Sequence, residues 1–406
     1  MFLCPNVECR LMKYPIGIQS FDQIVEGGFV YVDKTALVYR LVTEGKTYFL
    51  SRPRRFGKSL LLSTLACYFQ GRRELFDGLV IAGLEKEWLS YPVFRMDFNG
   101  GVFTQPGELE STIEAYLANW EDEYGKDVHA RTVGDRFKGV LRRAAEQTGR
   151  RVVVLIDEYD KPILDVLGTE ACLLDGTGRK ISLEDHHRDI LKGLYSTFKA
   201  ADEYLQFVLL TGVTKFSQVS VFSGFNQPAD ISMDERYEAL CGITQDELEH
   251  YFAEPIARLA EKYKEEETEM RARLKRQYDG YHFSSAMTDV YNPFSILNAF
   301  ARNHISDYWF ATGTPTYLIR LLRHGGEQMN ELTGKFYAPS LFVDYKADVE
   351  RPLPMIYQSG YLTIKDYDIR LDSYLLDFPN NEVRKGFQVL LASGYLSPSK
   401  EEIPRR

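Results

Sequence analysis

The sequence predicts an α/β protein built on a parallel β-sheet with helices on both faces. From residue 47 onward, short apolar strand patterns alternate with amphipathic helical patterns. One strand pattern, residues 152–156, is apolar at every position, so both of its faces must be covered by other elements. Strands that alternate with helices in this way form parallel sheets, and ligands bind at the carboxyl ends of their strands.

The expected elements of this sheet region follow in order along the chain. A short strand at 47–51 leads through a loop into a helix whose apolar pattern extends to Phe69 and stops at Gly71. The other expected elements are a strand at 93–98, helices near 109–124 and 135–147, the strand at 152–156, a helix around 190–198 and a strand at 207–210.

The pattern becomes mainly helical after about residue 240. Thr244 and Glu247 form a T-x-x-E capping box, which marks the start of a helix. We expect this helix to lead into residues 261–276, where 11 of 16 residues are charged, a composition typical of a solvent-exposed helix face. Helical pattern continues over 292–322, and two short strands are expected at 361–365 and 371–376, a shape that suits a winged-helix-like segment.

Composition excludes several classes of protein. The chain has 406 residues, more than one core usually fills, and 58 acidic residues against 49 basic ones give a net charge of −9. This acidic balance argues against a protein that coats nucleic acid with its whole surface. No apolar stretch reaches the ~20 residues of a membrane helix. The five cysteines form no C-x-x-C pair, and no secretory signal is present, so we expect a reducing cytoplasm.

The strongest chemical signal is Gly57-Lys58-Ser59, placed between a buried strand and a helix. The N-terminus of a helix binds phosphate through unpaired N–H groups and a positive dipole. In the G-x-x-x-x-G-K-[ST] motif the glycine allows close approach, the lysine reaches the β/γ-phosphates and the serine ligates Mg²⁺. Arg52 stands where this motif has its first glycine, so an ordinary helix start is the alternative interpretation.

Polar residues at two other strand ends strengthen the phosphate interpretation. Asp157 and Glu158 follow the all-apolar strand, and such acids hold Mg²⁺ and polarise the attacking water in phosphoryl-transfer sites. Thr211 ends the next strand, where it either senses the γ-phosphate or is a turn residue. Arg54 and Arg55 add positive charge to the loop and either contact phosphate or lie on the surface.

Longer sequence blocks surround these residues. They are YPIGIQSF at 14–21, YVDKT at 31–35, FLSRPRRFGKS at 49–59, LIDEYDKP at 155–162, TGVTKF at 211–216, YDGY at 278–281, YNP at 291–293 and YWFATGTP at 308–315. Together, over roughly residues 12–380, they resemble the AAA-ATPase-like family of bacterial P-loop proteins. The arginine at position 52 is part of that family's pattern.

The resemblance implies a P-loop NTPase core that binds ATP and Mg²⁺, followed by a helical lid and a winged-helix-like segment. The implied boundaries are an N-terminal extension at 1–11, the core at 12–243, the lid at 244–340, the winged-helix-like segment at 341–385 and a tail at 386–406. The implied catalytic residues are Lys58, Glu158 and Thr211, and the implied metal ligands are Ser59 and Asp157. The implied nucleotide-binding residues are Arg54, Arg55, Phe56, Gly57, Lys58, Ser59 and Leu60.

Members of this family usually continue into a PD-(D/E)XK nuclease domain. Only about twenty residues of this chain follow the winged-helix-like pattern, and no nuclease sheet fits in that length, so we expect no nuclease activity from it. DNA, a nuclease domain or another protein remain the candidate partners. Neither the oligomeric state nor the source of an arginine finger follows from the sequence.

The main hypothesis is an ATP-hydrolysing switch that regulates a nuclease or a nucleic-acid transaction. A nucleotide-binding module without turnover is the first alternative. A DNA-binding regulator is another, since basic residues occur at 271–276 and at Arg320 and Arg323. A small-molecule kinase is a weaker alternative, because P-loop folds also transfer phosphoryl groups.

Overall fold

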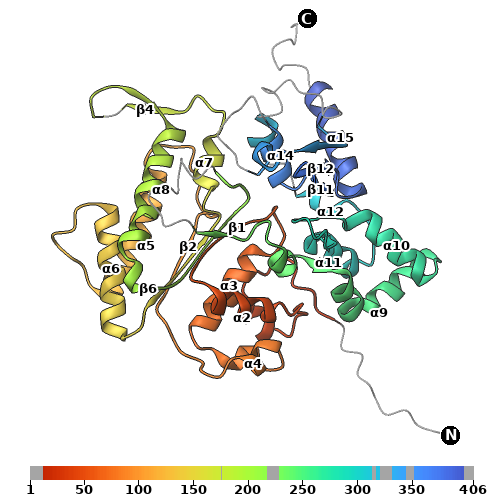
Figure 1. Ribbon diagram of the computed structural model, residues 1–406, viewed down its shortest axis with the longest axis horizontal. Helices are drawn as coiled ribbons and strands as arrows, with labels where there is room; N and C mark the ends of the chain where they lie inside the picture. The colour runs from red at the N-terminus through yellow and green to blue at the C-terminus, as the bar shows by residue number, and fades with distance from the viewer. Residues whose placement is uncertain are drawn as a thin grey trace, which may run out of the picture.

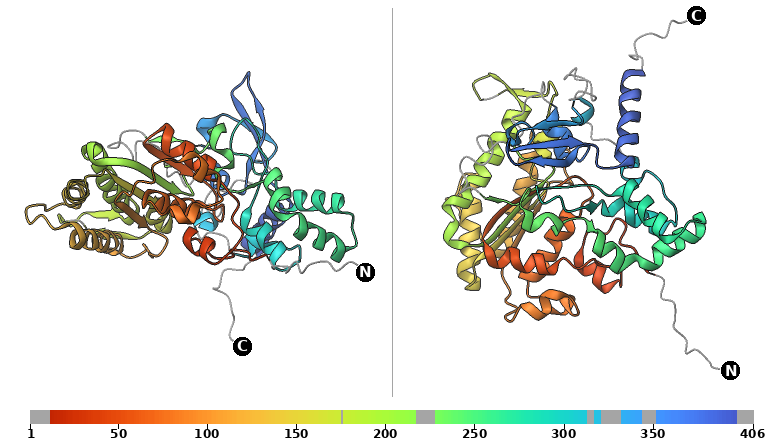
Figure 2. Two further views of the ribbon diagram at one scale, coloured as in Figure 1. Left: turned by 90° about the horizontal axis from the view of Figure 1, so that it is seen from below. Right: turned by 45° about the vertical axis from the view of Figure 1, so that its right-hand side comes forward.

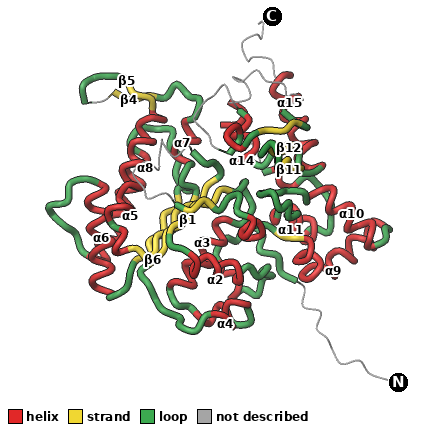
Figure 3. The backbone as a smooth tube through the Cα atoms, in the orientation of Figure 1, coloured by secondary structure: helices red, strands yellow, loops and turns green. Residues whose placement is uncertain are grey.

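The protein has a central β-sheet with helices on both faces and a second, mainly helical part beside it, as Figure 1 shows. Figure 3 shows that the longer strands gather in the middle of the molecule. The computed structural model describes residues 12–174, 176–216, 228–312, 317–320, 332–343 and 352–396, with side chains up to residue 390.

The central sheet has five strands in the order β2-β3-β6-β1-β7. All neighbouring strands in it are parallel, as the sequence predicts. The apolar strand β3 is buried along its whole length because strands flank both of its edges and helices cover both of its faces. The strands are β1 (Thr47–Ser51), β2 (Val93–Asp97), β3 (Val152–Asp157), β6 (Leu205–Gly212) and β7 (Ala229–Asp230).

Helix α3 (Lys58–Phe69) packs on β3 and β6 from one side of the sheet. On the other side lie α5 (Glu108–Tyr124), α6 (Val133–Thr148) and α8 (Leu183–Ala200), which pack on one another (Figure 2). All four helices occur where the apolar periodicity predicts them. Two of them start at a side-chain cap, α6 at Thr132 and α8 at Ser182, and each cap accepts the backbone N–H three residues later.

Shorter elements complete this part of the molecule. The segment before β1 contains two helices, and a β-hairpin that the sequence pattern does not predict precedes α8. These elements are α1 (Phe21–Glu26), α2 (Thr35–Glu44), η1 (Arg73–Phe76), α4 (Val80–Leu84), α7 (Lys161–Val166), β4 (Cys172–Leu174), β5 (Lys180–Ser182), η2 (Asp202–Tyr204) and η3 (Glu235–Leu240).

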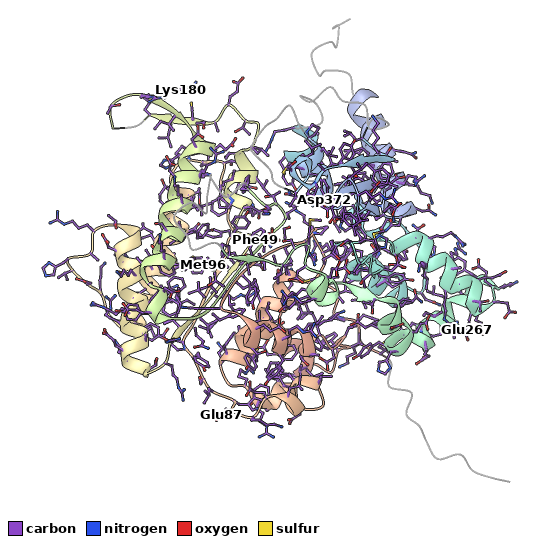
Figure 4. All side chains as sticks on the ribbon, in the orientation of Figure 1. Phe49, Glu87, Met96, Lys180, Glu267 and Asp372 are labelled. Carbon is purple, nitrogen blue, oxygen red and sulfur yellow. The ribbon has the colours of Figure 1, made fainter. Side chains whose placement is uncertain are left out.

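The helical part has its own apolar core. Its elements are β8 (Ile243–Thr244), α9 (Gln245–Tyr263), α10 (Glu267–Tyr278), β9 (Val290–Tyr291), α11 (Pro293–Ala301) and α12 (Tyr308–Ala311). The capping box of Thr244 and Glu247 is present at the start of α9. The helix reaches residues 261–263 of the charged segment and then ends, because Lys264 takes a left-handed backbone with φ of 59° and the chain turns before α10. Glu267, at the start of α10, lies at the outer edge of the molecule (Figure 4).

The C-terminal elements form a small antiparallel sheet with two helices. The sheet has the order β10-β12-β11, and the two strands expected from the sequence are its β11 and β12. Helix α15 extends across the expected boundary between residues 385 and 386, and the winged-helix assignment remains a prediction. The elements are β10 (Lys335–Tyr337), η5 (Pro339–Leu341), α14 (Leu353–Gln358), β11 (Thr363–Asp368), β12 (Ser373–Asp377) and α15 (Asn381–Leu396).

The C-terminal sheet shares an apolar core with the central one. Tyr361, Ile364 and Leu376 are buried and belong to the same apolar cluster as the strands β1, β3 and β6. Figure 4 shows side chains in the space between the ribbons of the central sheet and those of the C-terminal elements. Across the described ranges, no helix combines the length and the apolarity needed to cross a membrane.

Candidate functional site

The loop between β1 and α3 ends in a helix start that is open to an anion. Gly57 precedes the first turn of α3 and has a φ of 97°, a left-handed conformation that glycine adopts without a steric penalty. No side chain caps this helix. The first N–H groups of a helix lack partners inside it, and together with the helix dipole they bind negatively charged groups. The start of α3 therefore offers a phosphate site.

Lys58 connects this loop to the end of β3. Its side chain is almost completely buried, and its Nζ donates hydrogen bonds to the carbonyl oxygens of Arg52 at 3.1 Å and Pro53 at 3.4 Å. The same Nζ lies 3.4 Å from Oε1 of Glu158. The structure thus brings together Lys58 and Glu158, two of the predicted site residues, although 100 positions separate them in the chain.

Asp157 and Thr211 lie side by side at the ends of β3 and β6. The Thr211 hydroxyl donates to Oδ1 of Asp157 at 2.8 Å, and the Glu158 N–H donates to the same oxygen at 3.1 Å. The other oxygen, Oδ2, is buried and has no hydrogen-bond partner among the described residues. A buried carboxylate oxygen without a partner is costly unless a cation or water binds to it.

These residues fit a Mg²⁺ ion. The Asp157 carboxylate provides the free oxygen, and Ser59 lies half-buried in the first turn of α3. Mg²⁺ prefers oxygen ligands, usually one or two from the protein, with phosphates and waters supplying the rest. Burial, together with the nearby Asp157 carboxylate, also raises the pKa of Asp97 at the neighbouring end of β2.

Asp160 was given no role by the sequence, but it organises the same edge. It is fully buried, and its Oδ2 accepts hydrogen bonds from the N–H groups of Val213 at 3.0 Å and Thr214 at 2.6 Å and from the Thr214 hydroxyl at 2.6 Å. The Tyr159 hydroxyl donates to the Thr214 carbonyl at 2.9 Å. The turn after β3 therefore holds the segment that follows β6.

The surroundings of Asp160 change the pKa of its carboxyl group. Burial, reinforced by the Glu158 carboxylate, raises the pKa of Asp160 to about 6. Its sequence signal was its place in the block 155–162, two residues after the predicted acidic pair. That signal shows proximity to the site but cannot show which backbone groups the carboxylate holds.

Arg52 points away from the phosphate loop. Its guanidinium is buried and donates to the carbonyl oxygens of Ser232 at 2.7 Å and Tyr237 at 3.3 Å, and it lies 4.0 Å from the centre of the Phe283 ring. Burial lowers the pKa of Arg52. The arginine at the first motif position therefore connects the loop to the chain after β7, and its side chain leaves the start of α3 open.

The other loop residues contact the helical part. The Arg55 guanidinium lies 5.1 Å from the centre of the Phe294 ring, and that of Arg54 lies 5.8 Å from the Tyr317 ring. Phe56 is buried. The structure thus places Arg54 and Arg55 against aromatic rings, whereas the sequence left a choice between phosphate and the open surface. Cation–π contacts of this kind leave the exposed arginines able to turn toward a ligand.

Two hydrogen bonds join helix α12 and the C-terminal elements to this site. Trp309 Nε1 donates to the carbonyl oxygen of Arg54 at 3.2 Å. Gln358, at the end of α14, accepts the Lys215 N–H at 2.9 Å and so contacts the segment after β6. Glu382, buried at the start of α15, accepts the Trp309 backbone N–H at 2.6 Å. Helix α12 therefore contacts the phosphate loop and α15, and the C-terminal part contacts the strand-end segment through α14.

A mainly apolar cavity of about 100 Å³ lies next to the start of α3. Gly57 and Leu60 form one end of it, so it opens beside the proposed phosphate site. Its other walls come from the segment before α2, from α2 and α3, and from the chain around β8, α9 and α11. Those residues are Pro15, Val30, Tyr31, Val32, Lys34, Val38, Phe56, Leu61, Thr64, Leu240, Cys241, Gly242, Ile243, Phe252, Pro293 and Leu297.

The basic residues considered for nucleic-acid binding are mostly engaged. Arg271 and Arg273 form ion pairs with glutamates of their own region, at 3.0 and 2.6 Å. Arg320 donates to three backbone carbonyls in and after α7. Arg323 lies outside the described residues. These contacts leave little of the expected basic cluster free for phosphates.

Comparison with known proteins identifies the family. Residues 15–222 match the family described as "Predicted AAA-ATPase". An uncharacterized protein in the vnfD 5′ region of Azotobacter chroococcum mcd 1 is 40% identical over 388 residues, which cover 95% of this chain and 70% of that protein. The structure of the Aeropyrum pernix ORC1 protein in complex with DNA aligns with 90% of this chain and 93% of its own, at 12% identity and a TM-score of 0.27, a likeness too low to support a conclusion. The family match and the Azotobacter relative show that this chain belongs to the AAA-ATPase-like family of predicted AAA-ATPases.

Proposed function

We propose that this chain binds ATP with Mg²⁺, hydrolyses it, and uses the nucleotide state to shift its C-terminal part. One observation carries the proposal. Lys58, Glu158 and the unpartnered oxygen of Asp157 meet at one edge of the sheet, beside the uncapped start of α3. Phosphate binding, metal binding and activation of water need these groups together.

Each residue has a distinct role in the proposed reaction. The N–H groups at the start of α3 and the Lys58 ammonium bind the phosphates and stabilise the charge that develops on them. Ser59 and Asp157 would hold the metal, and Thr211 keeps the Asp157 carboxylate oriented through its hydroxyl. Mg²⁺ held there would neutralise phosphate charge. Glu158, released from Lys58 when phosphate takes the ammonium, orients the attacking water.

The nucleobase is proposed to occupy the apolar cavity. Gly57 and Leu60 belong both to the phosphate site and to the cavity, so one nucleotide can reach both. Apolar pockets with few polar groups are typical sites for flat heterocycles. The ring would lie between the segment before α2 and the chain around β8.

The switch is proposed to act through the C-terminal contacts. Arg54 in the phosphate loop is bonded to Trp309 of α12, which contacts α15, and Lys215 after the strand that carries Thr211 is bonded to Gln358 of α14. A movement of either segment on nucleotide binding therefore changes contacts of Trp309 or Gln358. The family resemblance alone suggests the target, which would be a nuclease or a nucleic acid.

A direct DNA-binding role is less well supported. The turn between β11 and β12 exposes Asp372 beside Arg370, and β11 exposes Asp366. Lys365 is occupied by the carbonyl oxygens of Gly280 and Pro379 at 2.8 and 2.9 Å. A wing that binds phosphates needs free positive charge.

The test is steady-state ATP hydrolysis by the purified chain with Mg²⁺, with and without DNA. Glu158→Gln should keep nucleotide binding and lower turnover about 100-fold or more, because a positioned general base contributes that much. Glu87→Gln, at an exposed position, is the matched control and should behave as wild type. Stimulation by DNA would identify nucleic acid as the trigger.

Two results would change the assignment. Wild-type turnover in Glu158→Gln would show that another group activates the water. Tight ATP binding without turnover in the wild type would favour the nucleotide-binding module.

A further inference from the structure

The motif at 31–35 is joined to the first turns of α9 by a partly buried ion pair. Lys34 Nζ donates to Oε1 of Glu247 at 2.6 Å and also to Oε2. The two side chains are only 11% and 22% exposed, although 213 residues separate them in the chain. Burial lowers the pKa of Lys34, while the Glu247 carboxylate opposes this shift.

A second contact supports the same connection. The Asp33 N–H donates to the Tyr251 hydroxyl at 3.2 Å. Tyr251 follows Glu247 by four residues, so both lie on one face of α9. The Asp33 carboxylate accepts the N–H groups of Thr35 and Val80, each at 2.8 Å, which anchors the motif to the starts of α2 and α4. The motif is therefore hydrogen-bonded to the starts of α2 and α4 through the Asp33 carboxylate and to α9 through Lys34 and the Asp33 N–H.

The ion pair lies beside the apolar cavity. Lys34 lines the cavity together with Tyr31 and Val32, while Ile243 and Phe252 line it from the chain that flanks Glu247. Glu247 also accepts the Thr244 N–H at 2.8 Å, so the carboxylate that holds Lys34 also caps the helix that forms the facing wall. The ion pair thus joins the two walls between which the nucleobase is proposed to lie.

An ion pair that is largely withdrawn from water contributes little net stability by itself. Charged groups lose hydration on burial, and apolar side chains of similar size often pack as well or better. Removing one partner leaves the other charge buried, so the pair favours one arrangement of the two walls over others. In this protein the ion pair fixes the distance between the two walls of the cavity.

We infer that Lys34 and Glu247 are positioning residues of a nucleobase subsite, holding its two walls at the separation that accepts a purine ring. This inference rests on the proposed nucleotide-binding function and adds a part that the phosphate motif does not contain. The hydrogen bonds of Lys34 and Glu247 among the described residues do not involve the phosphate loop, so we expect their effect to be confined to ligands that carry a base.

The experiment compares two ligands by calorimetry with Mg²⁺ present. ATP carries a base, whereas inorganic tripolyphosphate does not. Lys34→Met removes the charge but keeps the length of the side chain, and it should raise the Kd for ATP at least about tenfold while leaving that for tripolyphosphate unchanged. Lys34→Arg can still pair with the carboxylate and should bind ATP within about threefold of wild type.

A second variant and a matched control complete the design. Glu247→Gln keeps an oxygen for the Thr244 N–H and should weaken ATP binding in the same selective way, even if Lys34→Met does not fold. The control is Lys46→Met, which breaks an ion pair with Asp202 at 2.8 Å that joins distant segments away from the cavity. It should change neither Kd.

Three other results would overturn the positioning role, the nucleobase subsite or the proposed function. Equal weakening of both ligands, or no weakening in Lys34→Met and Glu247→Gln, would overturn the positioning role. Equal affinity of the wild type for ATP and tripolyphosphate would show that the cavity takes no base, while the phosphate site stands. A wild-type chain that binds neither ligand would overturn the proposed function and this inference with it.

Discussion

The two halves of the proposed nucleotide site are built in opposite ways around the start of α3. On one side, polar groups at the ends of β3 and β6 lie in a bonded array, in which Thr211 holds Asp157 and Lys58 pairs with Glu158. On the other side lies an apolar cavity whose walls come from segments before α2 and around β8. Among the described residues, the polar half contains buried carboxylate oxygens without hydrogen-bond partners on Asp157 and Asp160, while the apolar half offers space.

Because one half is polar and the other apolar, the two halves select a ligand by different interactions. Charged and hydrogen-bonding groups recognise phosphate and metal through directed bonds, which depend on single atoms. An apolar wall recognises a ring through shape and excluded water, which depends on the separation of whole segments. Substitutions in the polar half should therefore affect every phosphate ligand, and those in the apolar half only nucleotides.

The largest effect is expected at Lys58. Lys58→Ala should weaken binding of both ATP and tripolyphosphate about 1,000-fold, because the loop loses its buried cation and Glu158 is left without it. Calorimetry with both ligands measures this loss, and Lys192→Ala, an exposed position on α8, is the control. Retention of tripolyphosphate binding would contradict the division between the two halves.

Arg52 gives the next effect, on stability. Arg52→Gly restores the first glycine of the phosphate motif, yet it should lower the free energy of unfolding by about 3 kcal/mol, because the carbonyls of Ser232 and Tyr237 lose a buried donor. Urea denaturation measures the change. Arg95→Gly, partly exposed in β2, is a comparison for the loss of an arginine side chain. An unchanged or higher stability would show that the arginine has no structural role.

The smallest expected effect is a pH dependence at Asp160. Its pKa of about 6 in the folded chain lies above that of an unfolded aspartate, so the folded state retains a proton between about pH 4 and 6 that the unfolded state has lost. Stability from this group is present at low pH and is lost as the pH rises through 6.

Asp160→Asn should remove this pH-dependent contribution to the free energy of unfolding. The stability of the wild type relative to the variant should fall by about 2–3 kcal/mol between pH 4 and pH 8. Urea titrations of both proteins across this range measure the difference, and contributions from other titrating groups cancel. Parallel curves would mean that the Asp160 carboxylate titrates normally.

Much of the fold followed from the sequence because its signals are local. The apolar run at 152–156 predicts a covered strand, and the periodicity at 109–124 and 135–147 predicts two helices that the structure contains. The break at Lys264 did not follow, since a charged run has no apolar period that would mark a turn. The two-residue strand β7 was also missed, because two residues are too few to show a pattern.

The site residues likewise divide into those that local sequence signals predict and those whose contacts lie far away in the chain. Lys58, Ser59, Asp157, Glu158 and Thr211 stand at strand and helix ends, and parallel strands bring such ends to one edge, so the sequence pointed to the polar half. The roles of those residues in ATP binding and hydrolysis stay predictions. Asp160 and Arg52 could not be interpreted from position alone, because each acts on backbone groups of a segment distant in the chain.

By itself, then, the sequence determined the parallel sheet, the helix start that invites an anion and the acids that face it, since each depends on neighbours a few residues away. Only the tertiary structure decided which way Arg52 points, that Lys34 meets Glu247, and that a cavity opens beside Gly57. The physical reason is that packing between distant segments depends on the separation and orientation of whole elements. Local propensity carries no information about either.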